Sequence, residues 1–134
     1  MRFKCRCISK GKAEGIALVS KKPLSLFGDI NLDSGVVVAD DSDIRGLSVA
    51  GRVLIFPYGR GSTVGTYALL RMKKRKTSPI AIVNRETEVI IAVGAIIANI
   101  PLVDKLNNEF FDVVRSGDRV FVNADDGYVE ILDD

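Results

Sequence analysis

The feature that most constrains the fold is a buried strand followed by a glycine-rich turn, a helix and a second strand, all between residues 52 and 83. An apolar run at 52–56 predicts the first strand. Apolar residues at helical spacing over 64–72, followed by a basic run, predict the helix, and Pro79 introduces a second strand at 80–83. A strand–helix–strand unit of this length makes its two strands parallel, with a right-handed crossover. The chain therefore contains one βαβ unit.

The segments around this unit are short, and each is bounded by turn residues. A second helix is predicted at 88–98. The remaining expected strands are 2–8, 16–19, 35–38, 101–103 and a C-terminal hairpin of 119–122 and 128–132. The length of 134 residues and the absence of an internal linker predict one α+β domain over residues 1–134. We expect barrel-like β layers with helices on one side.

A long irregular segment, 23–34, lies between two of these strands. It carries Leu24, Leu26 and Phe27, which are too apolar for a free tether. We expect this segment to pack against something, and a partner chain is one candidate.

The chain has two cysteines, Cys5 and Cys7, and no histidine. Alternation puts both thiols on one face of the first strand, where they are either a metal or redox pair or two small core residues. Two thiolates cannot fill the four positions of a zinc or iron–sulfur site, so we favour the core and expect no metal bound by this chain. The absence of histidine also removes the commonest general base.

The charge and hydropathy of the chain exclude several kinds of partner. A formal net charge of +2 is too small to indicate a polyanion ligand, and the basic run Lys73–Lys76 suits a helix end. No aromatic residues interleave with that run, so we expect no nucleic-acid partner. The start of the chain lacks an apolar export signal, and the longest apolar stretch, 89–100, is well short of the roughly 20 residues that a bilayer span needs. We expect a soluble, cytoplasmic protein.

The loop at 57–67 is the segment most suggestive of a function. It leaves a buried strand and opens a helix, which is where α/β proteins bind ligands. Gly59 and Gly61 let the backbone turn and approach a ligand closely. Ser62 would lie at the positive helix end, with Arg60 adding charge, and both conditions favour an anion or an ionised serine.

Several interpretations of this loop compete. Its G-x-G-x-x-x-G spacing differs from the G-x-G-x-x-G of dinucleotide-binding turns, and no lysine precedes Thr66 as a P-loop requires. A serine hydrolase would need a base that a chain without histidine does not offer. A plain helix N-cap at Ser62 or Thr63 is also consistent with the pattern. The residues alone leave a ligand-binding loop and a simple cap open.

Longer motifs identify a family. They are Gly11-Lys12-Ala13-Glu14-Gly15, Leu54-Ile55-Phe56-Pro57, Gly59-Arg60-Gly61-Ser62-Thr63-Val64-Gly65, Ala81-Ile82-Val83-Asn84, Gly94-Ala95 and Ile100-Pro101-Leu102-Val103-Asp104. Over nearly its whole length, the chain resembles the swivel domain, or small subunit, of the aconitase X family. The Gly-Ser-Thr-Val-Gly core is the most specific of these motifs.

The resemblance implies a swivelling β/β/α domain that docks on a large catalytic subunit. That subunit would carry an iron–sulfur cluster acting as Lewis acid on the departing hydroxyl. The implied reaction is the dehydration of a small phosphorylated hydroxy acid, (R)-5-phosphomevalonate, to trans-anhydromevalonate 5-phosphate. Dehydration of cis-3-hydroxyproline, as in bacterial relatives, is the alternative within the family. A non-catalytic anion- or nucleotide-binding module is the alternative outside it.

The resemblance also assigns roles to individual residues. The family's catalytic serine falls on Ser62, as the base that removes a proton next to the substrate carboxylate. Ordinary aconitases have a carboxylate-binding arginine shortly after the serine pair, whereas this chain has Val64 there. An anion clamp must therefore come from Arg60, from the loop at Gly61 and Thr63, or from the large subunit. Asn84 and Glu86, just past the second parallel strand, are further substrate-binding candidates, with turn formation as the alternative.

Overall fold

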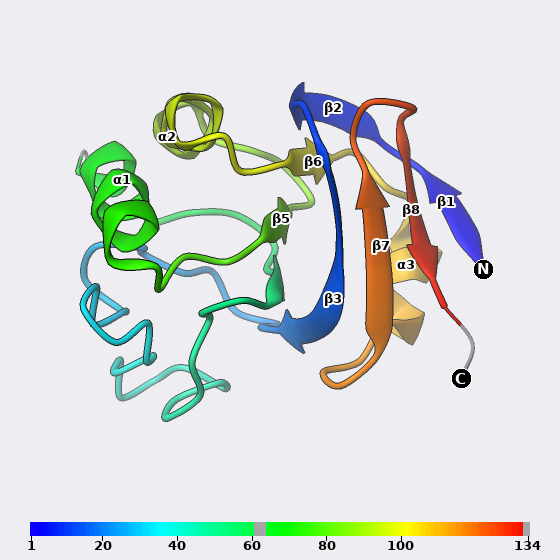
Figure 1. The fold of residues 1–134 in the computed structure, drawn as a ribbon. Coiled ribbons are helices and arrows are strands. Elements are labelled where there is room, and N and C mark those ends of the chain that lie inside the picture. Colours follow the sequence, from blue (N-terminus) through cyan, green and yellow to red (C-terminus); the bar gives the residue numbers. More distant parts are fainter. Residues whose placement is uncertain (61–63, 133–134) are drawn as a thin grey trace.

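The fold is known from a computed structural model, which describes residues 1–60 and 64–132 (Figure 1). Helices and strands alternate after an all-β start. The strands are β1 (Arg2–Lys4), β2 (Arg6–Ser9), β3 (Lys12–Val19), β4 (Val53–Ile55), β5 (Ala81–Val83), β6 (Leu102–Asp104), β7 (Arg119–Asn123) and β8 (Tyr128–Ile131). The helices are α1 (Gly65–Arg75), α2 (Val89–Ala98) and α3 (Asn108–Val113).

The strands form one eight-stranded sheet in the order β1-β8-β7-β3-β4-β5-β6-β2. The long strand β3 belongs to both halves, because it pairs antiparallel with β7 through residues 12–16 and parallel with β4 through residues 17–19. β1 and β2 lie at opposite edges of the sheet, although only Cys5 separates them in the chain. The sheet must therefore curl back on itself. This confirms the barrel-like β layers, and the predicted C-terminal hairpin is β7–β8.

The predicted βαβ unit is confirmed as β4–α1–β5, with Val53 opposite Ala81 and Ile55 opposite Val83 in parallel register. A second crossover, β5–α2–β6, was not predicted. The reason is that β6 has only three residues, and its sequence pattern does not reveal which strand it pairs with. Its parallel pairing with β5 depends on α2 returning the chain to the same sheet.

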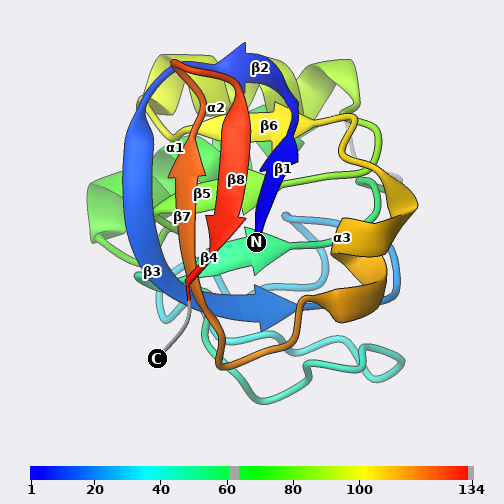
Figure 2. The same cartoon turned by 90° about the vertical axis from the view of Figure 1, so that its right-hand side faces the viewer.

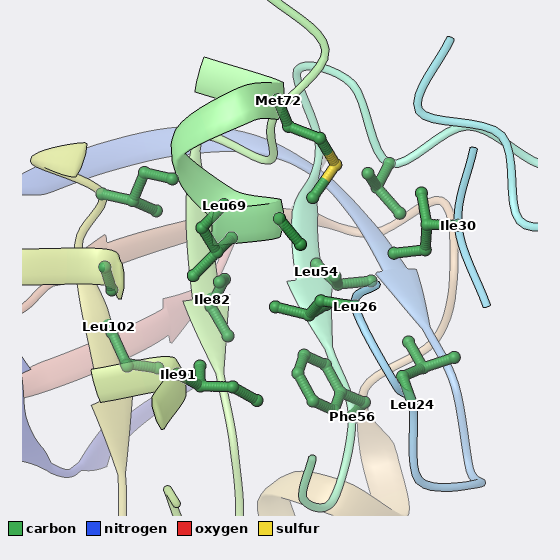
Figure 3. Close-up of a cluster of buried hydrophobic side chains, with 14 of the residues drawn as sticks. Leu24, Leu26, Ile30, Leu54, Phe56, Leu69, Met72, Ile82, Ile91 and Leu102 are labelled. Carbon is green, nitrogen blue, oxygen red and sulfur yellow. The ribbon is translucent and has the colours of Figure 1, made fainter. Parts of the chain in front are cut away.

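Two hydrophobic cores lie on the two faces of the parallel strands. Leu54, Ile82 and Leu102 point toward α1 and α2, where they meet Leu69 and other side chains (Figure 3). Their sequence neighbours Val53, Val83 and Val103 point the other way, toward β7, β8 and α3. Because they are covered on both faces, these three-residue strands are buried throughout. The molecule is a β/β/α arrangement, as predicted.

Two predictions about regular structure need correction. The segment 35–38 is not a regular strand: Val36 and Val37 form only isolated bridges, within an irregular segment that folds on itself. The helices do not all lie on one side. α3 lies away from α1 and α2, beside the arrowheads of β3, β4 and β6 (Figure 2). It is held there because Phe110 is fully buried and packs edge-on against Phe3, with ring centroids 5.3 Å apart.

The prediction of two core cysteines on one continuous strand is wrong. The strand breaks at Cys5, whose backbone N–H donates to the carbonyl of Gly127 in the β7–β8 turn. Cys5 is half-buried, while Cys7 is exposed. The break in pairing changes which side chains face inward, so the alternation does not carry across it.

The segment 23–34 packs against this chain's own core, as its apolar residues predict. Leu24 and Leu26 are buried with Phe56 and Leu54 (Figure 3). These two leucines are therefore not available to a partner chain. Phe27 remains 46% exposed and lies beside the Tyr67 ring.

Candidate functional site

The serine loop starts at the edge of the sheet where the parallel strands end. β3, β4, β5 and β6 run in one direction, so their carboxyl ends meet at this edge. The polypeptide leaves β4 there and re-enters regular structure at α1. The three loop residues predicted to act on substrate, Gly61, Ser62 and Thr63, lie outside the described residues. The site is therefore defined by its surroundings.

Two helices begin side by side at this edge. The hydroxyl of Thr66, in the first turn of α1, donates to the carbonyl of Ile90 in the first turn of α2 at 2.7 Å. Neither helix carries an acidic side chain in its first turn. The partial positive charges of both N-termini are therefore concentrated here, beside one carboxylate, that of Glu88 at the N-cap of α2.

The start of α1 bears on the simple-cap interpretation of the serine loop. The N-cap residue is Val64, and no side-chain cap hydrogen bond is made. The simple-cap interpretation concerns Ser62 and Thr63, which lie outside the described residues.

The described glycines of the loop have a packing role rather than the predicted turn role. A Cβ atom on Gly59 would lie 2.3 Å from Cδ1 of Ile91, and one on Gly65 would lie 3.3 Å from Cγ2 of Ile90. Gly59 does not adopt a positive φ. These glycines allow α2 to pack tightly against the loop, so they hold the loop beside the start of α2.

Arg60 is held by two carboxylates. Its Nη2 lies 3.2 Å from Oδ2 of Asp29 and 3.3 Å from Oδ1 of Asp41. The hydrogen bonds that Arg60 donates to Asp41 and Asp29 raise the pKa of Arg60, and they lower the pKa of Asp41. Its backbone N–H donates to the carbonyl of Leu24. Arg60 lies at the site, but the charge it would offer an anion is largely neutralised.

Asn84 follows β5 and is completely buried. Its Nδ2 donates to the carbonyl of Phe56 at 2.9 Å, which joins the ends of β5 and β4 just before the serine loop. Its Oδ1 has no hydrogen-bond partner among the residues described. This geometry makes Asn84 a positioning residue for the start of the loop.

Glu86 lies on the same edge and is exposed. Its carboxylate pairs with the ammonium of Lys105, which follows β6. The residue between the two predicted candidates, Arg85, was missed. The sequence feature that could have revealed Arg85 is a positively charged residue two positions after a buried strand. The structure thus brings Arg60, Asn84 and Glu86 to one edge of the sheet, although each has a partner within the chain.

The residues present do not fit a metal cluster. No group of three or more His, Cys, Asp or Glu side chains that could hold a metal occurs in ranges 1–60 and 64–132. The thiol of Cys5 is a poor ligand as well, because burial, then the neighbouring Cys7 and Asp104, raise its pKa to about 12. A cluster needs three or four thiolates.

Exposed apolar side chains surround the start of the serine loop and continue along α2. We call these residues the apolar collar: Phe27, Tyr58, Val64, Tyr67, Val89, Val93, Ile96 and Ile97. On α2, they follow the spacing of one helical face. The helix has no charged residue, so its outer face is as apolar as its buried face. Within the described part of the chain, no helix has the length and hydropathy to cross a membrane.

The fold and the site together define a small β/β/α domain that presents a serine loop, helix N-termini and an apolar collar at one edge. Residues 2–131 match the model of the aconitase X swivel domain. The chain belongs to this family. It is similar to the phosphomevalonate dehydratase small subunits of Archaeoglobus fulgidus (53% identity, covering 99% of this chain and all of that one) and Methanosarcina mazei (47%, covering 98% and 92%).

Solved structures agree with this assignment. A crystal structure of Thermococcus kodakaraensis aconitase X in its holo-form superposes with a TM-score of 0.94, at 47% identity and with 99% of each chain covered. The solution NMR structure of a UPF0107 protein gives a TM-score of 0.93 at 53% identity, covering 99% of this chain and all of that one. The predicted family and the α+β swivel-domain fold are confirmed.

Proposed function

We propose that this chain is the small subunit of a hydro-lyase that converts (R)-5-phosphomevalonate to trans-anhydromevalonate 5-phosphate. The observation that carries the proposal is the set of relatives named phosphomevalonate dehydratase small subunit. They are 44–53% identical to this chain over nearly its full length. The whole of residues 1–134 acts as one swivelling domain, in the cytoplasm.

Ser62 is the proton-abstracting base. It follows Arg60 at the edge where two helix N-termini meet, and their partial charges favour an ionised hydroxyl. In this form, Ser62 takes the proton from the carbon next to the substrate carboxylate. The electron pair of that C–H bond becomes the new C=C bond, and the neighbouring hydroxyl leaves with its own bonding pair. The departing hydroxide takes up one proton to become water, and Ser62 releases the proton that it removed, so the net product besides the alkene is one molecule of water.

The active site is completed by a large subunit. The described residues supply the serine loop's surroundings but no cluster ligands, so we assign the iron–sulfur cluster to the partner. The apolar collar supports this arrangement, because it includes Tyr58 and Val64 at the two described ends of the loop and continues along α2. Patches of this kind mark interaction surfaces. The collar is the docking surface for the large subunit.

The docking surface is tested by charge substitution. Val93→Glu and Ile97→Glu, on the exposed face of α2, should prevent co-purification with the large subunit because they bury a charge in an apolar contact. Leu47→Glu is the control, since Leu47 is comparably exposed but belongs to the 20–52 segment rather than to α2. Complexes that form equally well with all three variants would show that the collar is not the interface.

The function is tested by co-expression with the candidate large subunit and an anaerobic dehydration assay. The complex should turn over (R)-5-phosphomevalonate, and neither subunit alone should. Turnover of cis-3-hydroxyproline instead would favour the other family activity. Ligand binding without turnover of either compound would favour a non-catalytic anion- or nucleotide-binding module.

The role of Ser62 is tested in the same complex. Ser62→Ala should lower kcat by about 10²–10⁴-fold, the usual contribution of a positioned base. Stability should fall by no more than about 1 kcal/mol, the usual cost of losing a helix cap. Thr63→Ala is the matched control and should cost less activity. A Ser62→Ala complex with near-normal kcat would reduce the loop to a binding turn.

A further inference from the structure

Arg85 is a cation held in a fixed orientation at the carboxyl edge of the sheet. Its Nη1 donates to Oδ1 of Asn108 at 2.8 Å, and its Cζ lies 4.2 Å above the centre of the Phe111 ring. Its backbone N–H donates to the carbonyl of Pro57 at 2.9 Å. Among the residues that the structure describes, no carboxylate pairs with Arg85 and no acceptor uses its Nε or Nη2. Its charge and most of its donors therefore remain free.

Two other described cations at this edge, one after β4 and one after β6, are already paired with carboxylates. Arg60 is held by Asp29 and Asp41, and Lys105 pairs with Glu86. An anionic ligand at either cation would have to compete with a carboxylate already present. No carboxylate of residues 1–60 and 64–132 forms an ion pair with Arg85, which makes it the better anion site of the three.

Arg85 lines a cavity of about 240 Å³ between the ends of β3 and β4 and helix α3. Lys21, Ser20 and Pro57 contribute to the same cavity. Its lining includes one carboxylate, that of Asp112, against the two cations. A phosphate binds well to a guanidinium whose donors are pre-oriented, with an ammonium as a second point charge.

The cavity adjoins the serine loop. Pro57, in its wall, lies five residues before Ser62 in the chain. Phosphomevalonate is anionic at both ends, with its carboxylate beside the reacting carbons and its phosphate at the opposite end. When a base removes the proton next to the carboxylate, the phosphate therefore lies at the other end of the substrate, away from that base. A cationic cavity whose wall includes Pro57, at the start of the serine loop, is suited to bind that distant phosphate.

We infer that Arg85, together with Lys21, binds the phosphate of the substrate and gives the enzyme its preference for a phosphorylated hydroxy acid. This inference rests on the proposed function. It adds a specificity-determining residue that contacts the end of the substrate remote from the chemistry. The ring of Phe111 and the amide of Asn108 position the guanidinium for it.

The test compares phosphorylated and unphosphorylated substrates in the complex with the large subunit. Arg85→Gln should lower kcat/KM for (R)-5-phosphomevalonate by about 10- to 100-fold, the loss expected for charge-assisted hydrogen bonds to a phosphate. It should leave kcat/KM for mevalonate unchanged. Arg85→Lys should be intermediate. Arg75→Gln, at the far end of α1, is the control for loss of one positive charge.

A second readout does not depend on turnover. Isothermal titration calorimetry of the complex with inorganic phosphate should show binding that is weakened in Arg85→Gln and unchanged in Arg75→Gln. Equal phosphate affinity, or equal losses for both substrates, overturns the assignment of Arg85 while leaving the proposed dehydratase in place. If the wild-type complex turns over neither substrate, the proposed function fails, and the calorimetry still decides whether Arg85 binds phosphate.

Discussion

Replacing Asn84 with aspartate tests whether this residue joins the ends of β4 and β5. The wild-type amide donates to the carbonyl of Phe56 at 2.9 Å and is fully buried. Aspartate has the same size but cannot donate when ionised, so a buried carboxylate would face a carbonyl oxygen. Burial raises the pKa of such a group by roughly 2–3 units above about 3.9, its value in the unfolded chain. At 1.36 kcal/mol per unit, Asn84→Asp should lose about 3–4 kcal/mol of stability at pH 7.

The pH dependence of this loss has a definite sign. A carboxyl whose folded pKa is raised destabilises the protein above that pKa, and the penalty disappears as the pH falls below the unfolded value. A protonated carboxyl can also donate to the carbonyl of Phe56 again. The Tm of Asn84→Asp should therefore lie roughly 10–20 °C below wild type at pH 7 and approach wild type near pH 4.

Thermal unfolding followed by circular dichroism at several pH values measures this difference. Asn107→Asp is the matched control. Asn107 is the N-cap of α3, its side chain accepts from the N–H of Phe110, and aspartate caps a helix equally well. If Asn84→Asp melts within about 3 °C of wild type at pH 7, the buried amide is not needed to hold the strand ends. A loss that does not shrink at low pH would contradict the proposed cause.

The other predictions use the same measurements or simple chemistry. Asp104→Asn should cost about 2 kcal/mol at neutral pH. Burial alone would raise the pKa of Asp104, but its hydrogen bonds give a net lowering, so in the same melting series the deficit relative to wild type should begin to shrink as the pH falls below about 4 and should disappear only below the lowered pKa of the folded state. Gly94→Ala should lower the Tm measurably, because its Cβ would lie 3.0 Å from Cα of Thr66; an unchanged Tm would show that α1 and α2 separate freely. At pH 8, iodoacetamide should modify exposed Cys7 and spare Cys5, so mass spectrometry should find one adduct rather than two.

The sequence by itself determined the local elements and the family. The strand, helix and strand between residues 52 and 83 follow from apolar spacing and good start and stop signals, and the structure confirms them as β4, α1 and β5. The second helix and the C-terminal hairpin are confirmed for the same reason. The Gly-Ser-Thr-Val-Gly motif indicated the family without any tertiary information. These features depend on neighbours in the chain, which a periodic pattern records.

Only the tertiary structure decided which candidate site residues are free. The side chain of Arg60 meets Asp29 and Asp41, which lie 31 and 19 residues away in the chain, and Asn84 meets the carbonyl of Phe56, 28 residues away. No local pattern records such contacts, because they form when parallel strands bring their carboxyl ends to one edge of a sheet. For the same reason, only the fold shows that Arg85 pairs with no carboxylate of residues 1–60 and 64–132.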